Sequence, residues 1–262
     1  MSNKNESLGK TLFVVVALCL VCAVIVAGSA VGFKPMQQRN AALDMQRNVL
    51  DAAGLLQPDT NVVELFEQRV ETKLVNLDTL EVMDSFAGQP AIQFDIRAAA
   101  RDAELSESLT KAEDEAGIGR LENITQVYFI NNEAGELETV VLHIRGYGLW
   151  GIMYGLMALE SDVNTVRGIN FYEHAETPGL GGEIQNPRWV ASWRGKEIYA
   201  ESGEQVAIDV TKNATSEAHD IDALSGATLT SNGVENLIQF WFSDQAYGPM
   251  LDKIRKGELT NG

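Results

Sequence analysis

Cysteine is scarce in this chain: 262 residues include two, Cys19 and Cys22, and both lie inside one apolar run. A soluble domain held together by disulfides is therefore excluded. A Cys-x-x-Cys pair alone does not make a metal site, and we interpret the two as small apolar packing residues. Histidine is scarce too, and His143, His174 and His219 lack metal-ligand spacing, so the sequence predicts no metal site.

Positive charge is also in short supply. Lys and Arg number 20 against 37 Asp and Glu, which gives a formal net charge of −17. Because nucleic acids are bound by basic surfaces, a nucleic-acid partner is excluded. The acidity also argues against docking on anionic lipid by charge, although a well-solvated surface would have the same composition. The length allows one or two domains with a sizeable core.

One stretch contains no charged residue. Residues 11–33 are uncharged and mostly apolar, between Lys10 and Lys34. As a helix that rises about 1.5 Å per residue, this stretch would cross a hydrocarbon core of about 30 Å. A cleaved signal peptide is the alternative, but its apolar region is about 7–15 residues, so we favour a retained anchor. The basic residues beside the stretch do not show which end is cytoplasmic. The sequence thus predicts a tail at 1–10 and one transmembrane helix at 11–33.

The rest of the chain divides into a stalk and a soluble domain. Residues 34–60 are polar and helix-prone; Pro35 suits a new helical start or a kink, and Gly54 and Pro58 end the segment. In residues 61–262, hairpin-linked strands and helices predict an α+β domain with an antiparallel sheet and flanking helices. Strands are expected at 91–96, 127–130, 137–144, 166–172 and 205–210, a hairpin turn at 131–136, a helix with a strand-like end at 62–77, and a short helix from Pro187.

A short motif between a polar and an apolar segment is the strongest functional signal. It consists of Asp222, Ser225, Gly226, Ala227 and Thr228. Gly226 permits a turn with positive φ and Ala227 adds little bulk, so Thr228 would be displayed on a narrow turn. The apolar segment that follows predicts a helix, for which good N-cap residues are Thr230, Ser231 and Asn232. A negative group on Thr228 would face the positive end of that helix. A plain capping turn would have the same sequence features.

A second glycine-rich stretch follows the strand expected at 166–172. Its polar side chains could contact the edge of a flat ring, and its glycines let backbone approach the ring face. Leucine and tryptophan side chains could cover that face. An ordinary surface loop is the alternative interpretation. The candidate ring-binding residues are Glu176, Thr177, Gly179, Leu180, Gly181, Leu149 and Trp150.

A competing motif is found at Gly146–Gly151, which fits G-x-G-x-x-G and has Glu173 placed 22 residues after it. This spacing is typical of a nicotinamide-binding fold. The helix that should follow, at 152–160, is short, and no further strand–helix units suggest a doubly wound sheet. Tyr147 and Trp150 also place bulk where a pyrophosphate would lie. A nicotinamide dehydrogenase therefore remains a minor alternative.

The two functional stretches together resemble a known family. Asp-x-x-Ser-Gly-Ala-Thr at 222–228 is similar to the acceptor motif of domains that carry FMN covalently, and Glu-Thr-Pro-Gly-Leu-Gly at 176–181 is similar to their second signature. With Gly-Leu-Trp at 148–150 and one N-terminal span, the chain resembles the C subunits of bacterial sodium-translocating NADH:quinone oxidoreductases. The G subunits of Rnf complexes share the flavin motifs. Residues 79–116 match least.

This resemblance implies both a cofactor and a role. FMN would be held by a phosphoester bond to Thr228, placed there by a separate flavin transferase that takes FMN from FAD, with Asp222 serving that attachment. The chain would carry electrons inside a membrane complex that oxidises NADH, reduces ubiquinone and pumps sodium, and no residue would act as a catalytic acid or base. Its partners would be the other membrane subunits, with the soluble domain on the periplasmic side of the bacterial inner membrane. The alternatives are an Rnf-type ferredoxin:NAD oxidoreductase subunit and a non-redox, membrane-tethered binding domain.

Overall fold

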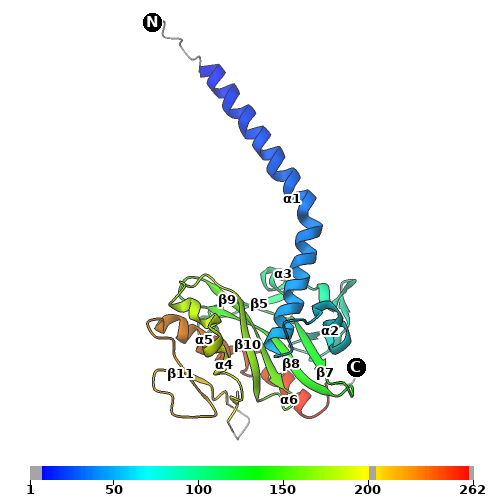
Figure 1. Ribbon diagram of the computed structural model, residues 1–262, viewed down its shortest axis with the longest axis vertical. Helices are drawn as coiled ribbons and strands as arrows, with labels where there is room; N and C mark the ends of the chain where they lie inside the picture. Colours follow the sequence, from blue (N-terminus) through cyan, green and yellow to red (C-terminus); the bar gives the residue numbers. More distant parts are fainter. Residues whose placement is uncertain (1–7, 201–204, 260–262) are drawn as a thin grey trace. The chain divides into compact units, whose positions relative to one another are not determined.

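The computed structural model describes residues 8–200 and 205–259, so most of the predicted tail at 1–10 lies outside the described residues. The chain divides into two compact units, Met1–Met45 and Gln46–Gly262. The first described element is α1 (Leu8–Ala52), drawn in blue in Figure 1. It continues through Pro35, which lacks the N–H that would pair with the carbonyl of Val31. Its apolar part is long enough to cross a membrane.

A six-stranded antiparallel sheet is the centre of the second unit (Figure 1). Its spatial order is β10-β9-β8-β7-β1-β2. The architecture confirms the predicted α+β class, with an apolar N-terminal helix ahead of a sheet-and-helix domain. The strands of the sheet are β1 (Val70–Asn76), β2 (Val82–Met83), β7 (Ile124–Asn131), β8 (Leu137–Tyr147), β9 (Ile152–Glu160) and β10 (Val166–Glu173).

Short elements surround this sheet. The helices are α2 (Val62–Arg69), η1 (Ala91–Gln93), α3 (Ile96–Arg101), η2 (Gly181–Gln185), α4 (Pro187–Ala191), α5 (Thr228–Trp241) and α6 (Gly248–Arg255). Three two-stranded ribbons are formed by β3 (Ser85–Phe86) with β4 (Gln89–Pro90), β5 (Ser106–Ser108) with β6 (Arg120–Glu122), and β11 (Asp209–Thr211) with β12 (Asp220–Asp222).

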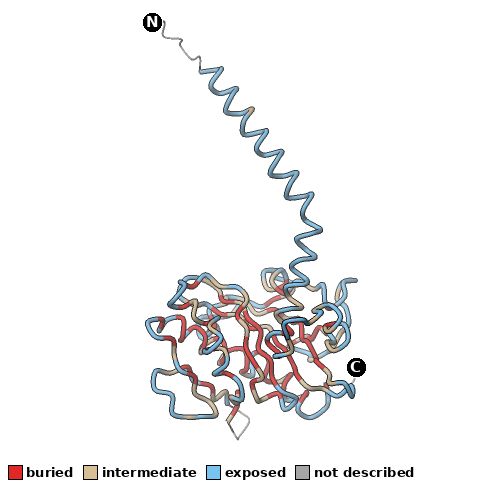
Figure 2. Tube along the Cα trace, viewed as in Figure 1, coloured by how far each residue is buried: buried red, intermediate tan, exposed pale blue. Residues whose placement is uncertain are grey.

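Both faces of the sheet are covered, as the red strands in Figure 2 show. Because side chains alternate along a strand, Leu142 and Ile144 of β8 point to one face and Val141 and His143 to the other. The first face packs against α5, and we call it the α5 face. On the opposite face, which we call the α2 face, the ring of Tyr128 lies 5.5 Å from that of His143. The sheet therefore separates two buried layers.

The end of α1 is part of the second unit. Leu50 is fully buried, and the side-chain amide of Asn170 in β10 donates a hydrogen bond of 2.9 Å to Asp51. A Cβ atom at Gly168 of β10 would lie 2.4 Å from the carbonyl oxygen of Ala52, so this approach requires glycine. The last turns of α1 thus pack against β10 through a close backbone contact and through side-chain hydrogen bonds.

Most of the predicted elements are confirmed, and two strands are not. The strands expected at 127–130, 137–144 and 166–172 are β7, β8 and β10, and the helix from Pro187 is α4. Residues 91–96 do not form a strand, because the carboxylate of Asp95 accepts from Ala98 N at 3.0 Å and caps α3 instead. The strand expected at 205–210 is reduced to the three residues of β11.

A partly buried histidine makes stability depend on pH. His143 Nε2 lies 3.2 Å from the hydroxyl oxygen of Tyr128 on the α2 face. Burial, and then the charges of Arg145 and Arg97, lower the pKa of His143 to about 3 from an ordinary 6.5. The unfolded chain takes up this proton near its ordinary pKa and the folded chain does not. Stability is therefore present above about pH 6.5 and lost as the pH falls towards 3.

We expect His143→Gln, which does not titrate, to weaken this pH dependence. Between about pH 6 and pH 4, the free energy of unfolding of the unmodified protein should fall by up to about 1.4 kcal/mol per pH unit more than that of the variant. Chemical denaturation of both proteins in detergent across this pH range measures the difference. Parallel curves would show that His143 takes up its proton in the folded state as readily as in the unfolded state.

Candidate functional site

Thr228 is the first residue of α5. Ala227 occupies the N-cap position, and no side chain among the described residues caps this end of the helix. The prediction that Thr230, Ser231 or Asn232 would be the cap is wrong, because the helix starts earlier. Ser231 binds the turn instead: its hydroxyl donates to Ala227 O at 3.1 Å and accepts from Leu224 N at 3.0 Å. The first N–H groups of a helix lack acceptors within it, so this end can receive an anion.

The turn before α5 displays its polar groups to solvent. Asp222, Gly226 and Thr228 are exposed, as is Ser225, while Ala227 is buried. Gly226 has a φ of 76°, the left-handed conformation that the sequence predicted for it. The Thr228 hydroxyl is therefore carried on an exposed turn at the N-terminus of a 14-residue helix.

The second candidate stretch lies beside this turn. A Cβ atom at Gly226 would be 3.3 Å from Leu180 Cδ2, so the two segments touch although they are far apart in the sequence. Thr177 is exposed, and its carbonyl oxygen accepts from Leu180 N at 3.1 Å. Gly179, with a φ of 76°, allows this tight turn. The loop thereby presents Leu180 next to the acceptor turn.

Glu176 joins three segments of the site. Its Oε1 accepts from Leu149 N at 2.9 Å and from Trp150 N at 3.0 Å. Its Oε2 accepts from the hydroxyl of Thr230 in α5 at 2.5 Å. Buried Gly181 leaves room for this contact, since its Cβ would lie 2.5 Å from both Glu176 Oε2 and Thr230 Oγ1. The turn at 148–150, the loop at 174–182 and the start of α5 therefore meet at one carboxylate.

Large apolar side chains are exposed on these same segments. Trp150 is 63% exposed, Leu229 59%, Leu180 46% and Leu149 41%. We call these four residues the apolar rim. Leu229 was not predicted, although its place directly after Thr228 in an apolar helix was a usable signal. Exposed apolar groups beside a helix N-terminus suit a ligand with an anionic end and a flat apolar ring.

The nicotinamide alternative is contradicted by the fold. Residues 152–160 form strand β9, which pairs along its length with β8, and not the helix that a pyrophosphate site needs. The glycines serve packing instead: a Cβ atom at Gly146 would lie 2.5 Å from Leu237 Cβ of α5, and one at Gly148 would lie 2.5 Å from Glu176 Oε1.

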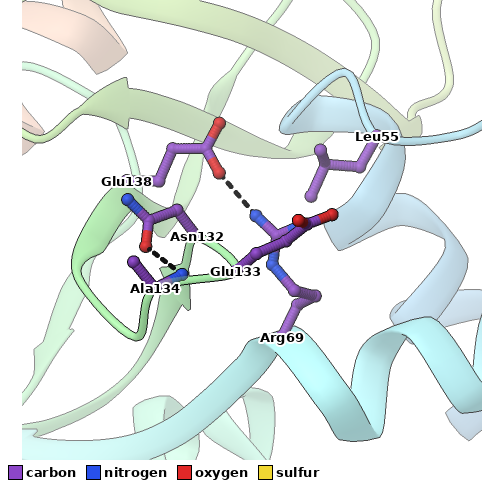
Figure 3. A pocket seen from close by; sticks show the side chains of 6 residues that line it. All are labelled: Leu55, Arg69, Asn132, Glu133, Ala134 and Glu138. Atoms are coloured by element: carbon purple, nitrogen blue, oxygen red, sulfur yellow. Dashed lines mark hydrogen bonds and ion pairs between the residues drawn. The ribbon is translucent and has the colours of Figure 1, made fainter.

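A hollow of about 560 Å³ lies elsewhere, between the chain after α1, α2 and the β7–β8 turn (Figure 3). Figure 3 shows the guanidinium of Arg69 directed at Glu138, with which it forms an ion pair of 2.5 Å. None of the residues predicted to bind flavin lines this hollow. Among the described residues, no group of three or more His, Cys, Asp or Glu could hold a metal ion.

Comparison with known proteins identifies the family. Residues 148–243, which contain all the segments of the predicted flavin site, match the model of the FMN-binding domain. The chain is 48% identical to the C subunit of the Na(+)-translocating NADH-quinone reductase of Yersinia pestis, over 98% of this chain and 97% of that protein. It is 44% identical to the Vibrio alginolyticus C subunit, over 99% of this chain and all of that protein. The chain belongs to this family of C subunits.

Solved structures from the C-subunit family share the fold. The NqrC protein of Shewanella oneidensis superposes with a TM-score of 0.76 at 35% identity, over 82% of this chain and 98% of that one. The C subunit of Parabacteroides distasonis gives 0.65 at 26% identity, over 83% and 96%. The residues present here fit an FMN group: a hydroxyl and helix N–H groups for its phosphate, and the apolar rim for its ring.

Proposed function

We propose that Thr228 carries FMN through a phosphoester bond and that the chain is an electron-carrying subunit of a sodium-pumping NADH:ubiquinone reductase. One observation carries the proposal: the Thr228 hydroxyl is exposed at the uncapped start of α5, beside the apolar rim. A buried threonine could not be modified in the folded protein, and a threonine without apolar neighbours would leave the ring in water. FMN, when bound, supplies reversible electron uptake.

Each part of the site has a separate task in this proposal. The N–H groups at the start of α5 stabilise the phosphate, because the helix dipole is positive there. Leu149, Trp150 and Leu180 offer apolar surface to the ring, while Ser225 and Gly226 keep the turn narrow enough for a transferase to reach Thr228. Thr177, Gly179 and Gly181 shape the neighbouring loop, and no side chain has to act as an acid or base.

Attachment requires a separate flavin transferase with FAD as the donor. In that transfer, Thr228 Oγ would form the bond to the FMN phosphorus, the bond from that phosphorus to the AMP oxygen would break, and the hydroxyl proton would leave. Asp222 is exposed at the end of β12, three residues before Ser225, where a transferase or its metal ion could bind the carboxylate. The phosphoester then keeps the flavin in place in a compartment that has no supply of FMN.

The relatives' names and the apolar helix support the cellular setting. We propose that residues 11–33 anchor the chain in the bacterial inner membrane, with stalk residues 34–60 and soluble domain 61–262 on the periplasmic side. Its partners are the lipid bilayer and the other membrane subunits. No charge lies between Lys10 and Lys34, so this chain does not conduct sodium alone. The identity to C subunits of the quinone reductase favours this complex over an Rnf-type complex.

Mass spectrometry of one peptide tests the proposal. Protein made together with a flavin transferase and FAD should yield a peptide spanning 225–230 that is heavier by FMN minus one water, with fragment ions that place the addition on Thr228. Protein made without the transferase should yield the unmodified peptide. An unmodified peptide from both preparations, with transferase activity shown on another acceptor, would refute covalent attachment.

A further inference from the structure

Glu176 is a buried carboxylate that forms no ion pair with any of the described residues. It is 5% exposed, and its two oxygens accept three hydrogen bonds from protein groups, two from the turn at 148–150 and one from Thr230. Hydrogen bonds to a charged acceptor are roughly twice as strong as neutral ones. This carboxylate therefore fixes the turn at 148–150 to the first turn of α5.

Glycines on two sides make room for this carboxylate. A Cβ atom at Gly148 would lie 2.5 Å from Glu176 Oε1, and one at Gly181 would lie 2.5 Å from Oε2. The backbone amide of Glu176 is also held, donating to His174 Nδ1 at 3.1 Å. The carboxylate is thus enclosed by backbone, and its oxygens are already engaged by protein donors. These contacts direct it away from the role of ring-edge ligand for which the sequence suggested it.

We propose that Glu176 is a positioning residue: it fixes the position of Thr228 relative to the apolar rim before the flavin is attached. Thr230, which it binds, is two residues after Thr228; Leu149 and Trp150, whose amides it binds, are rim residues. The carboxylate thus links, by hydrogen bonds, the segment that carries the acceptor threonine to the segment that carries Leu149 and Trp150. This inference depends on the proposed attachment of FMN at Thr228.

The first test uses hydrogen exchange in the full chain before flavin is attached. In Glu176→Ala, the amides of Leu149 and Trp150 lose their acceptor and should exchange at least about tenfold faster, while β7 and β8 stay protected. In Glu176→Gln, the amide oxygen can accept from the same two N–H groups, and its NH₂ can donate to Thr230 Oγ. The Gln variant should therefore exchange within about threefold of the unmodified protein.

The second test measures the rate of FMN attachment by a flavin transferase. Glu176→Ala, which removes all three hydrogen bonds, should slow attachment by at least roughly ten- to a hundredfold, because losing even one hydrogen bond to a charged group has an effect of this size. Thr230→Val, which removes only the bond to α5, should slow attachment about tenfold and leave the Leu149 and Trp150 amides protected. Thr230→Ser, which keeps the hydroxyl, should restore the rate. If the Ala variant does not fold, the Thr230 pair still decides the question.

Glu173→Gln is the matched control, because Glu173 is a neighbouring carboxylate, more than half exposed and ion-paired with Arg97. It should load FMN at the unmodified rate. The inference is overturned if Glu176→Ala loads as fast as the unmodified protein with unchanged exchange, or if Glu173→Gln slows attachment equally. If the unmodified protein accepts no FMN, the proposed function fails instead, and the exchange result still decides whether Glu176 fixes the turn.

Discussion

Thr228→Val is expected to fold normally and to contain no covalently bound FMN. Valine has nearly the shape of threonine, and the position is exposed at the start of α5, so stability should change by less than about 0.5 kcal/mol. The hydroxyl oxygen is the one atom lost, and without it no phosphoester can form. Flavin fluorescence of the denatured band on a gel measures the result, which should fall from full labelling to none.

Thr177→Val is the matched control for this experiment. Thr177 is also an exposed threonine, on the loop that touches the acceptor turn through Leu180 and Gly226. It lacks both a helix N-terminus and the Ser-Gly-Ala context, so its variant should keep the fluorescent band. Fluorescence that survives Thr228→Val and disappears with Thr177→Val would show that Thr177, and not Thr228, carries the flavin.

Gly233→Ala is expected to destabilise the protein by about 3 kcal/mol, although alanine favours helices. Gly233 lies in α5, and a Cβ atom there would be 2.5 Å from the carbonyl oxygen of Tyr147 and 3.1 Å from Gly148 Cα. Both neighbours are backbone, so neither can rotate away, and α5 must move off β8. Chemical denaturation in detergent measures the loss of unfolding free energy.

Gly151→Ala separates this packing effect from a general effect of losing glycine. A Cβ atom at Gly151 would lie 3.4 Å from Ala175 Cβ, which is an ordinary contact, and its φ is not in the left-handed region. Its stability should stay within about 0.5 kcal/mol of the unmodified protein. Gly233→Ala should also slow FMN attachment, because α5 carries Thr228. A Gly233→Ala protein more stable than the unmodified one would show that helix propensity outweighs the clash.

The antiparallel core was predictable because its signals are local. Residues 127–130 and 137–144 are rich in β-branched and aromatic side chains, and a glycine-containing turn joins them, so the hairpin of β7 and β8 follows from the sequence. The apolar run at 11–33 is equally direct, because its length alone matches a bilayer. In both cases nearby residues decide the structure.

Strand β9 was not predicted, because distant residues decide its structure, and residues 91–96 were wrongly predicted as a strand, because a local helix cap decides theirs. Residues 152–160 contain Met, Leu, Ala and Glu, which favour helices, yet pairing with β8 on one side and β10 on the other makes them a strand. Residues 91–96 alternate like a strand, but Asp95 uses its carboxylate to start α3. Propensity and alternation alone could not reveal either outcome.

The site residues that belong to a sequence motif could be predicted. The contacts between residues far apart in the sequence could not. The sequence indicated that Thr228 would be displayed, and the structure places it on an exposed turn. The position of Glu176 could not be foreseen, because its partners Leu149, Trp150 and Thr230 lie 26 or more residues away. Which of the candidate residues bind flavin stays a prediction that the variants above test.

The fastening of α1 to β10 determines how the protein can be shortened. Asp51 accepts a hydrogen bond from Asn170, and the carbonyl of Ala52 lies against the backbone at Gly168. The end of α1 is therefore part of the folded domain and not only a connection to the anchor. A water-soluble version cut at residue 60, the predicted end of the polar stalk, would uncover the face of β10 to which Gly168 and Asn170 point. This strand leads into the Glu176 loop. A version that begins near Gln46 would keep that side covered, and it sets the natural starting point for producing the domain without its anchor.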